Sequence, residues 1–291
     1  MKIKTLIIIV LFSISFNIYS QDTINKKRLT IFISSNVVAY TSGMIMLNQL
    51  WYKDYPRTDF HWFNDNDEWL QMDKFGHAYT SYYLSKVLSK GFSWTGINNR
   101  KSAILGASLG FLYISSIEIY DGFSENWGAS YGDLIANFSG SSIYLAQELI
   151  WHEQKIIPKF SFHTTNFPNY RPELLGTSLG EQILKDYNGQ TYWLSVNIKS
   201  IAHINKFPSW LNLAFGYGAT GMTGGKTNPE NTIDNSERMR QYYFSLDIDL
   251  NRIKTNSKIL KTVFSFVNII KIPFPTLEFS NKGIRAYPFY F

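Results

Sequence analysis

The stretch WLNLAFGYG, residues 210–218, decides the fold class because large apolar side chains alternate along it with small or polar ones. This period of two is typical of half-buried β-strands. It recurs in YYFSLDIDL, residues 242–250, in residues 194–198 and in the aromatic end of the chain, residues 287–291. The glycine-rich stretch 220–238 predicts a hairpin loop. We therefore expect the chain after Pro158 to form an antiparallel sheet of about four to six strands.

One segment of this region has a helical period instead. Apolar residues within 258–271 share one helical face, Lys258 and Lys261 lie off that face, and Pro273 follows, which predicts an amphipathic helix. A closed single-chain membrane barrel normally has about eight strands or more, so we expect an open sheet packed on helices. A barrel completed by further strands or by another copy of the chain is the alternative.

Before Pro158, apolar residues recur at helical spacing. We expect helices at about 73–90, stopped by Gly91, at about 99–120 and at about 132–154, with a loop at 53–72. Gly106 and Gly110 form a small-xxx-small pair that lets another helix approach closely. The uncharged cores of these helices are shorter than the ~20 residues that span a bilayer, so a compact bundle is expected.

The first residues read as an export signal. Lys2 and Lys4 precede an apolar core, and Ser20 offers a small residue before a cut at Gln21. Residues 29–52 carry no formal charge and are long enough to cross a hydrocarbon layer of roughly 30 Å, but polar residues interrupt them, so we interpret them as a buried or membrane-leaning helix. The predicted class is α+β, with a signal at 1–20, a helical domain at 21–157 and an antiparallel β domain at 158–291.

Composition narrows the function classes. The chain has no cysteine, which excludes disulfides, thiolate metal sites, a cysteine nucleophile and a conventional lipid anchor on cysteine. Its formal charge of +6 and its 17% aromatic content suit nucleic acid or a membrane. The export signal argues against nucleic acid, so a membrane or an anionic lipid is the expected partner. The expected location is the periplasm or outer membrane of a Gram-negative bacterium.

Polar residues in the most apolar part of the chain mark a candidate site. Asp73 and His77 stand four residues apart, as do Asp133 and Asn137, and Glu118 ends a long apolar run. Residues at i and i+4 share a helical face, and ionisable groups on apolar helices are costly unless they are paired or used. We therefore expect these five candidate catalytic residues to face one interior cluster.

Each of these residues also has a structural interpretation. Asp73 and Asp133 occupy positions suited to helix caps, His77 alone is more often a satisfied buried histidine, and Asn137 suits packing between close helices. Taken together, His77, Glu118 and Asp133 offer ligands for a divalent metal ion. General acid–base chemistry with His77 held by Asp73 and a purely structural polar network stay open beside it.

Several motifs resemble an uncharacterised family of bacterial envelope proteins described as predicted periplasmic lipoproteins. They are DKFGH at 73–77, EIYDGF at 118–123, WGASYGD at 127–133 and LIANFSG at 134–140. Downstream, RPELLG, KDYNGQTYWLSVNI and PSWLNLAFGYGATGM are similar to a longer form found in the Bacteroidetes lineage. The missing cysteine departs from the lipoprotein pattern.

A looser likeness joins the same helices to VanZ-like membrane proteins, which show Asp-Lys-x-x-His, a later Glu and Asp-x-x-x-Asn-x-x-Gly. By position, this resemblance implies a set of candidate residues here: Asp73, Lys74, His77, Glu118, Asp133, Asn137 and Gly140. It implies no established activity.

Three functions follow as expectations. The first is a structural or assembly component of the envelope, and the second is a hydrolase or transferase acting on a lipid or cell-wall precursor through the cluster. The third is a binding module for an anionic lipid. Convergence of the five side chains in an open cavity favours an enzyme or a binder, whereas a sealed and mutually satisfied cluster favours a structural role.

Overall fold

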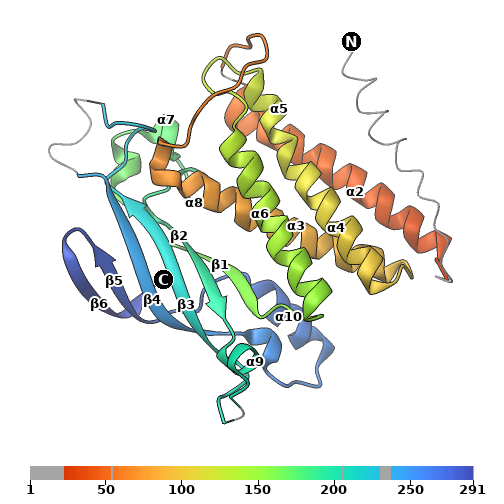
Figure 1. Cartoon of the computed structure of the whole chain (residues 1–291). Coiled ribbons are helices and arrows are strands. Elements are labelled where there is room, and N and C mark those ends of the chain that lie inside the picture. Colours follow the sequence, from red (N-terminus) through yellow and green to blue (C-terminus); the bar gives the residue numbers. More distant parts are fainter. Residues whose placement is uncertain (1–22, 54, 205, 230–236, 291) are drawn as a thin grey trace.

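The computed structural model describes residues 23–53, 55–204, 206–229 and 237–290. The predicted export signal lies outside the described residues. Helices packed together are followed by a six-stranded antiparallel sheet that is not closed (Figure 1). This confirms the predicted α+β class and the open sheet.

The helical part is arranged around α3. This helix contacts α4 and α6, and it also contacts strands β1 and β2 of the sheet, so it joins the two parts of the fold. Gly106 and Gly110 of α4 lie against Ser89 and Ser85 of α3, where any Cβ would collide with the partner backbone. The long helices of the described chain are α2 (Lys26–Leu47), α3 (Met72–Trp94), α4 (Asn99–Ser115), its short continuation α5 (Ile117–Gly122) and α6 (Tyr131–Ile150).

Helix ends differ from the expectations at several points, and α6 ends at Ile150 instead of about 154. Helix α3 runs through Gly91 to Trp94 because the glycine lies where a ring of α2, Phe32, packs against it. Asp73 is in the first turn of α3 and does not cap it. Asp133 likewise follows the cap of α6, since Ser130 Oγ accepts the backbone N–H of Asp133 at 3.1 Å. Both acids therefore lie where the helix dipole favours negative charge, and their side chains are free for the pocket.

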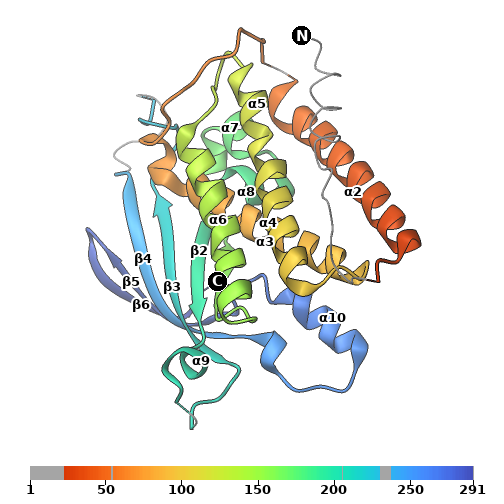
Figure 2. The ribbon, with the colours of Figure 1, turned by 45° about the vertical axis from the view of Figure 1, so that its right-hand side comes forward.

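Helix α2 lies along the outside of the bundle (Figures 1 and 2). It has no buried residue, so the interpretation as a buried helix is wrong. A π-helical stretch, Asn48–Tyr52, extends it toward the pocket. By length and composition alone, Lys26–Tyr52 and Asn99–Gly122 are apolar enough to cross a membrane, with 6% and 39% of their most apolar windows buried. The second therefore also serves as a core helix.

The sheet is a meander with the order β1-β2-β3-β4-β5-β6. Strands β1 and β5 were not predicted, because Pro158 and Pro275 weaken the strand signal in them; the register shifts next to Pro275. Ile198 begins α9 instead of ending a strand. The strands are β1 (Ile156–Phe162), β2 (Gln190–Val196), β3 (Leu211–Thr220), β4 (Met239–Ile248), β5 (Phe274–Ser280) and β6 (Gly283–Tyr290).

Short helices fill the connections between strands. The predicted amphipathic helix is present as α10, although it ends at Val267, four residues earlier than expected. The others are α7 (Pro172–Leu175), α8 (Leu179–Lys185) and α9 (Ile198–Ala202), with α10 at Lys258–Val267.

Candidate functional site

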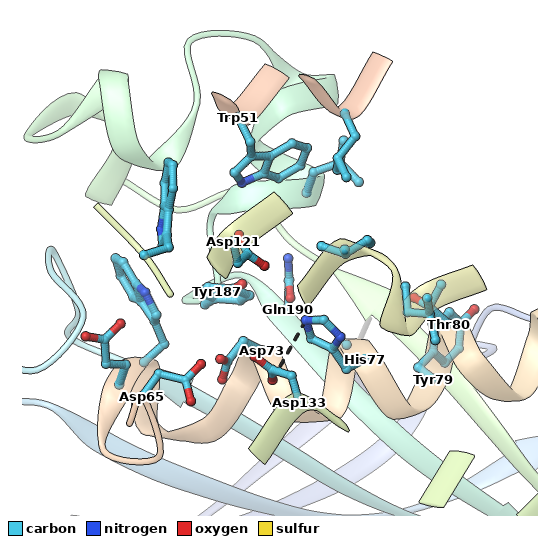
Figure 3. Close-up of a pocket in the computed structure, with 18 of the residues that line it drawn as sticks. Trp51, Asp65, Asp73, His77, Tyr79, Thr80, Asp121, Asp133, Tyr187 and Gln190 are labelled. Carbon is cyan, nitrogen blue, oxygen red and sulfur yellow. Dashed lines mark ion pairs between the residues drawn. The ribbon is translucent and has the colours of Figure 1, made fainter. Parts of the chain in front are cut away.

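A pocket of about 390 Å³ opens where the first turns of α3 and α6 meet α5 (Figure 3). Trp51 from the π-helical stretch after α2 and Tyr187 from the β1–β2 connection form part of its wall. Asp73, His77 and Asp133 point into it from the helices. Residues of the helical bundle and of one connection between strands therefore line the pocket together.

The structure brings the five sequence-predicted residues together. His77 Nδ1 lies 3.0 Å from Asn137 Oδ1 and 3.9 Å from Glu118 Oε1. His77 Nε2 lies 3.8 Å from Asp133 Oδ1, the pair drawn dashed in Figure 3. Asp73, one helical turn before His77, also lines the pocket. The i, i+4 spacing produced this arrangement, because each pair uses one face of its helix.

Lys74 supplies positive charge beside this cluster. Its Nζ lies 2.7 Å from Asp65 Oδ2, 2.9 Å from Asp73 Oδ2 and 2.9 Å from Asp133 Oδ1. Three carboxylates therefore share one ammonium group. Asp65 comes from the loop before α3 and was not singled out in the sequence, since loop acids carry no periodic signal.

Ser130 holds the pieces of the site in place. Its backbone N–H donates to Glu118 Oε2 at 2.9 Å, and its hydroxyl donates to Asp65 Oδ1 at 2.6 Å. The same hydroxyl oxygen accepts the first-turn N–H of Asp133. One serine thus fixes α5, α6 and the loop before α3 relative to one another.

The carboxylates are not fully satisfied within the described part of the chain. Buried Glu118 Oε1 and Asp73 Oδ1 have no hydrogen-bond partner there, and Asp133 Oδ1 meets Lys74 only as an ion pair outside hydrogen-bond geometry. Unpaired buried carboxylate oxygens are costly. The site therefore favours protons or a cation beyond Lys74.

Burial sets the proton affinities. It raises the pKa of Glu118 to about 8, and it raises the pKa of Asp133 to about 6 with further help from nearby Asp73. Burial alone would lower the pKa of His77, but the negative charges of Asp133 and Glu118 raise it above the ordinary value. Perturbed groups of this kind cluster at functional sites.

Two groups of side chains have the spacing of metal ligands. One donor atom from each of His77, Glu118 and Asp133 lies within 4.8 Å of the others, and the same holds for Asp65, Asp73 and Asp133. Lys74 already pairs with all three carboxylates of the second group. In the first, Asn137 Oδ1 can accept the Nδ1–H of His77, which fixes the tautomer and leaves the Nε2 lone pair facing Asp133. The nitrogen and carboxylate oxygens of this group suit a divalent cation.

A further acid, Asp121, lines the pocket and was not singled out in the sequence. Tyr52 donates its hydroxyl to Asp121 Oδ1 at 2.7 Å, and burial raises the pKa of Asp121 to about 6. Tyr52 also packs against Trp127 with ring centroids 5.7 Å apart. The end of α2 and the loop after α5 thus close one side of the pocket with aromatic rings.

Comparison with known proteins supports the expected resemblance. Residues 59–147 match the model of the family described as predicted periplasmic lipoprotein (DUF2279). The matched segment includes all five candidate residues as well as Lys74 and Gly140. No curated protein and no solved structure matches the chain. The family description agrees with export and implies attachment to a membrane, while the activity is unknown.

The cation-free protein is expected to lose stability as pH rises from about 4.5 to about 8. The folded state holds the Glu118 proton more tightly than the unfolded chain does, because the pKa rises from 4.5 to about 8 on folding. Unfolding free energy then falls by up to about 1.4 kcal/mol per pH unit in this window, and the raised pKa of His77 acts in the same direction.

Urea unfolding in chelator at several pH values measures this slope. Glu118→Gln should reduce the slope, leaving the part due to His77 and Asp133. Glu125→Gln, a matched change at an exposed position, should leave it unchanged. A parent protein whose stability rises across the window would contradict the assignment.

Proposed function

We propose that this is an exported envelope enzyme, a hydrolase or transferase that acts on a lipid or cell-wall precursor with a divalent cation held by His77, Glu118 and Asp133. The observation that carries the proposal is a set of buried carboxylate oxygens around His77 that have no hydrogen-bond partner in the described chain. Asp73 and Asp133 line the open pocket, and Glu118 Oε1 lies 3.9 Å from His77 Nδ1. A purely structural network would be expected to satisfy its own groups.

The chemistry follows from the donor set. A cation on these three side chains would polarise a bound oxygen or lower the pKa of a water molecule. Asp73 and Asp121 line the same pocket and can take or give a proton. Asn137 acts through His77 by fixing its orientation, so we assign it a positioning role.

Charge separates this proposal from a module that binds anionic lipid. Acidic residues dominate the polar wall of the pocket, and Lys74 is already shared among three of them. A bare anionic head group would be repelled there. An anionic substrate therefore needs the cation as a bridge.

A structural or assembly role is the second candidate, and a specific observation favours it. Short contacts tie α3, α6 and the loop before α3 together, and they are made by Ser130, Lys74 and Asp65. This half of the cluster is consistent with fold specificity alone. For either role we propose the outer membrane or the periplasm as the location.

Cation titration of the purified full chain tests the proposal. After removal of metal with chelator, Mn²⁺, Mg²⁺ and Zn²⁺ are added separately, and bound metal and thermal stability are measured. One equivalent of at least one cation should bind and raise the unfolding temperature. The loaded protein is then incubated with phospholipids and lipid-linked cell-wall precursors in mixed micelles, with and without chelator. If the protein neither binds a cation nor turns over a substrate, the enzyme proposal fails and the structural role remains.

A further inference from the structure

The two faces of the sheet have opposite chemistry. One row of residues, paired strand to strand, is apolar on every member: Pro158, Leu194, Phe215, Phe244, Leu277 and Ala286. The next row lies on the other face and contains charged and hydrogen-bonding groups: Lys159, Trp193, Gly216, Tyr243, Glu278 and Arg285. We call the first face the apolar face and the second the polar face.

The polar face is the buried one. Lys159 Nζ lies 2.6 Å from Asp247 Oδ2, and both side chains are fully buried. Ser195 donates its hydroxyl to the same carboxylate oxygen at 2.6 Å. Glu278 is also fully buried and accepts the Tyr287 hydroxyl at 2.8 Å. Charged groups therefore lie in the interior of the curved sheet, beside a buried aromatic cluster of Trp193, Tyr243 and Tyr290.

The apolar face is largely open where it extends beyond α3. Phe75 of α3 stacks on Tyr217 with centroids 4.5 Å apart and covers one side of the face. Strands β4 to β6 lie away from the helices in both views (Figures 1 and 2). Phe215 and Ile284 remain 50% and 70% exposed, and Leu194 and Leu277 are exposed as well.

This arrangement is inverted relative to a sheet in water, where the apolar face packs on the core and the polar face is solvated. Strands that face lipid alternate apolar outward and polar inward. We propose that the apolar face of the sheet contacts the acyl chains of a lipid bilayer. The inference does not depend on the cation chemistry of the pocket.

The border of the apolar face fits a head-group region. Tyr242 is 53% exposed at one end of it, and tyrosines are enriched at membrane interfaces. Tyr217 and Tyr192 continue its row in register, but α3 covers them through Phe75. Arg240 follows Tyr242 outward on the same face, where its charge would meet anionic head groups. From Tyr217 to Leu211 the strand rises about 20 Å, a depth comparable to the apolar band of membrane sheets.

The bundle favours lipid over a second copy of the chain as the occupant. It has the same inversion, because Ser81, Ser85 and Ser141 are buried between helices while Ile135 and Phe138 of α6 are 66% and 63% exposed. A second copy would cover one patch, whereas a bilayer meets apolar residues on both the sheet and the helices. The inversion in both parts points to a surrounding apolar solvent.

The proposal is tested with nitroxide labels on single cysteines, since the chain has none of its own. Phe215→Cys and Leu277→Cys place the label on the apolar face. Lys282→Cys, in the exposed turn between β5 and β6, is the water-facing control, and buried Ser245→Cys is the control for protein contact. The full chain is reconstituted into phosphatidylethanolamine/phosphatidylglycerol vesicles. Collision of each label with oxygen, which concentrates in hydrocarbon, is compared with collision with a water-soluble nickel chelate.

Labels at 215 and 277 are expected to collide with oxygen and to lose collision with the chelate, while the label at 282 shows the reverse. Chelate collision at 215 and 277 equal to that at 282 would overturn the proposal, because the face would then be in water. Low collision with both reagents, as at 245, would also overturn it. Dipolar broadening in that case would identify a second copy as the occupant. Cation uptake measured on the same variants keeps a failure here separate from a failure of the pocket.

Discussion

His77→Ala is expected to lower the affinity for a divalent cation by at least about 100-fold, since loss even of groups that only orient metal ligands costs 10–100-fold. The imidazole is one of three ligand groups whose donor atoms lie within 4.8 Å of one another. It makes one hydrogen bond to Asn137 and lies in a partly open position. Its removal therefore leaves few buried groups stranded, and the protein should stay folded. Bound metal, turnover and thermal unfolding measured on one preparation check all three expectations.

His61→Ala is the matched control, because it removes a histidine that belongs to neither group of potential metal ligands in the described chain. It should bind the cation as the parent does. The result that would contradict the prediction has two parts. His77→Ala would lose about 1 to 3 kcal/mol of unfolding free energy, and the parent protein would bind no cation. That result would replace the enzyme proposal with the structural one.

The convergence of the site was predictable from the sequence, but its full membership was not. The i, i+4 spacing on apolar helices predicts a shared face for two pairs of residues, Asp73 with His77 and Asp133 with Asn137. Asp65 lies in a loop, where spacing carries no information, and it contacts the cluster through Lys74 and Ser130. The caps were misjudged for a related reason, since Ser130 competes with Asp133 for the same role.

The polarity of the sheet shows another limit of sequence reasoning. Strict alternation identified β3 and β4 as strands with two unlike faces. Alternation alone does not tell which face is enclosed, because this depends on the curvature of the sheet and on the medium around it. The structure encloses Asn212, Ser195 and Asp247 and leaves Phe215 on the outside.

Lys159→Met is expected to destabilise the protein by about 3–5 kcal/mol, because it removes the ion-pair partner of the buried Asp247 carboxylate and leaves buried Lys271 as the nearby cation. Asp247 keeps the Ser195 hydroxyl and the backbone N–H of Ile272, which compensate part of the charge but not all of it. Lys159 also donates to Ile248 O and Asn268 Oδ1, so two further acceptors lose a donor. Urea unfolding of the purified variant measures the loss.

The double change Lys159→Met with Asp247→Leu separates charge from packing. Because it removes both charges together, most of the lost stability should return, as buried ion pairs often break even against apolar replacements of similar volume. Lys155→Met is the control for a less buried lysine: Lys155 pairs at 3.5 Å with Glu153, which is 42% exposed, and donates to Ser200 O at 3.0 Å. Its loss should cost less than the loss of fully buried Lys159, because solvent weakens its ion pair. A Lys159→Met variant as stable as Lys155→Met would mean that water reaches Asp247. The interior of the sheet would then be hydrated, and the inverted polarity of its two faces would lose its main support.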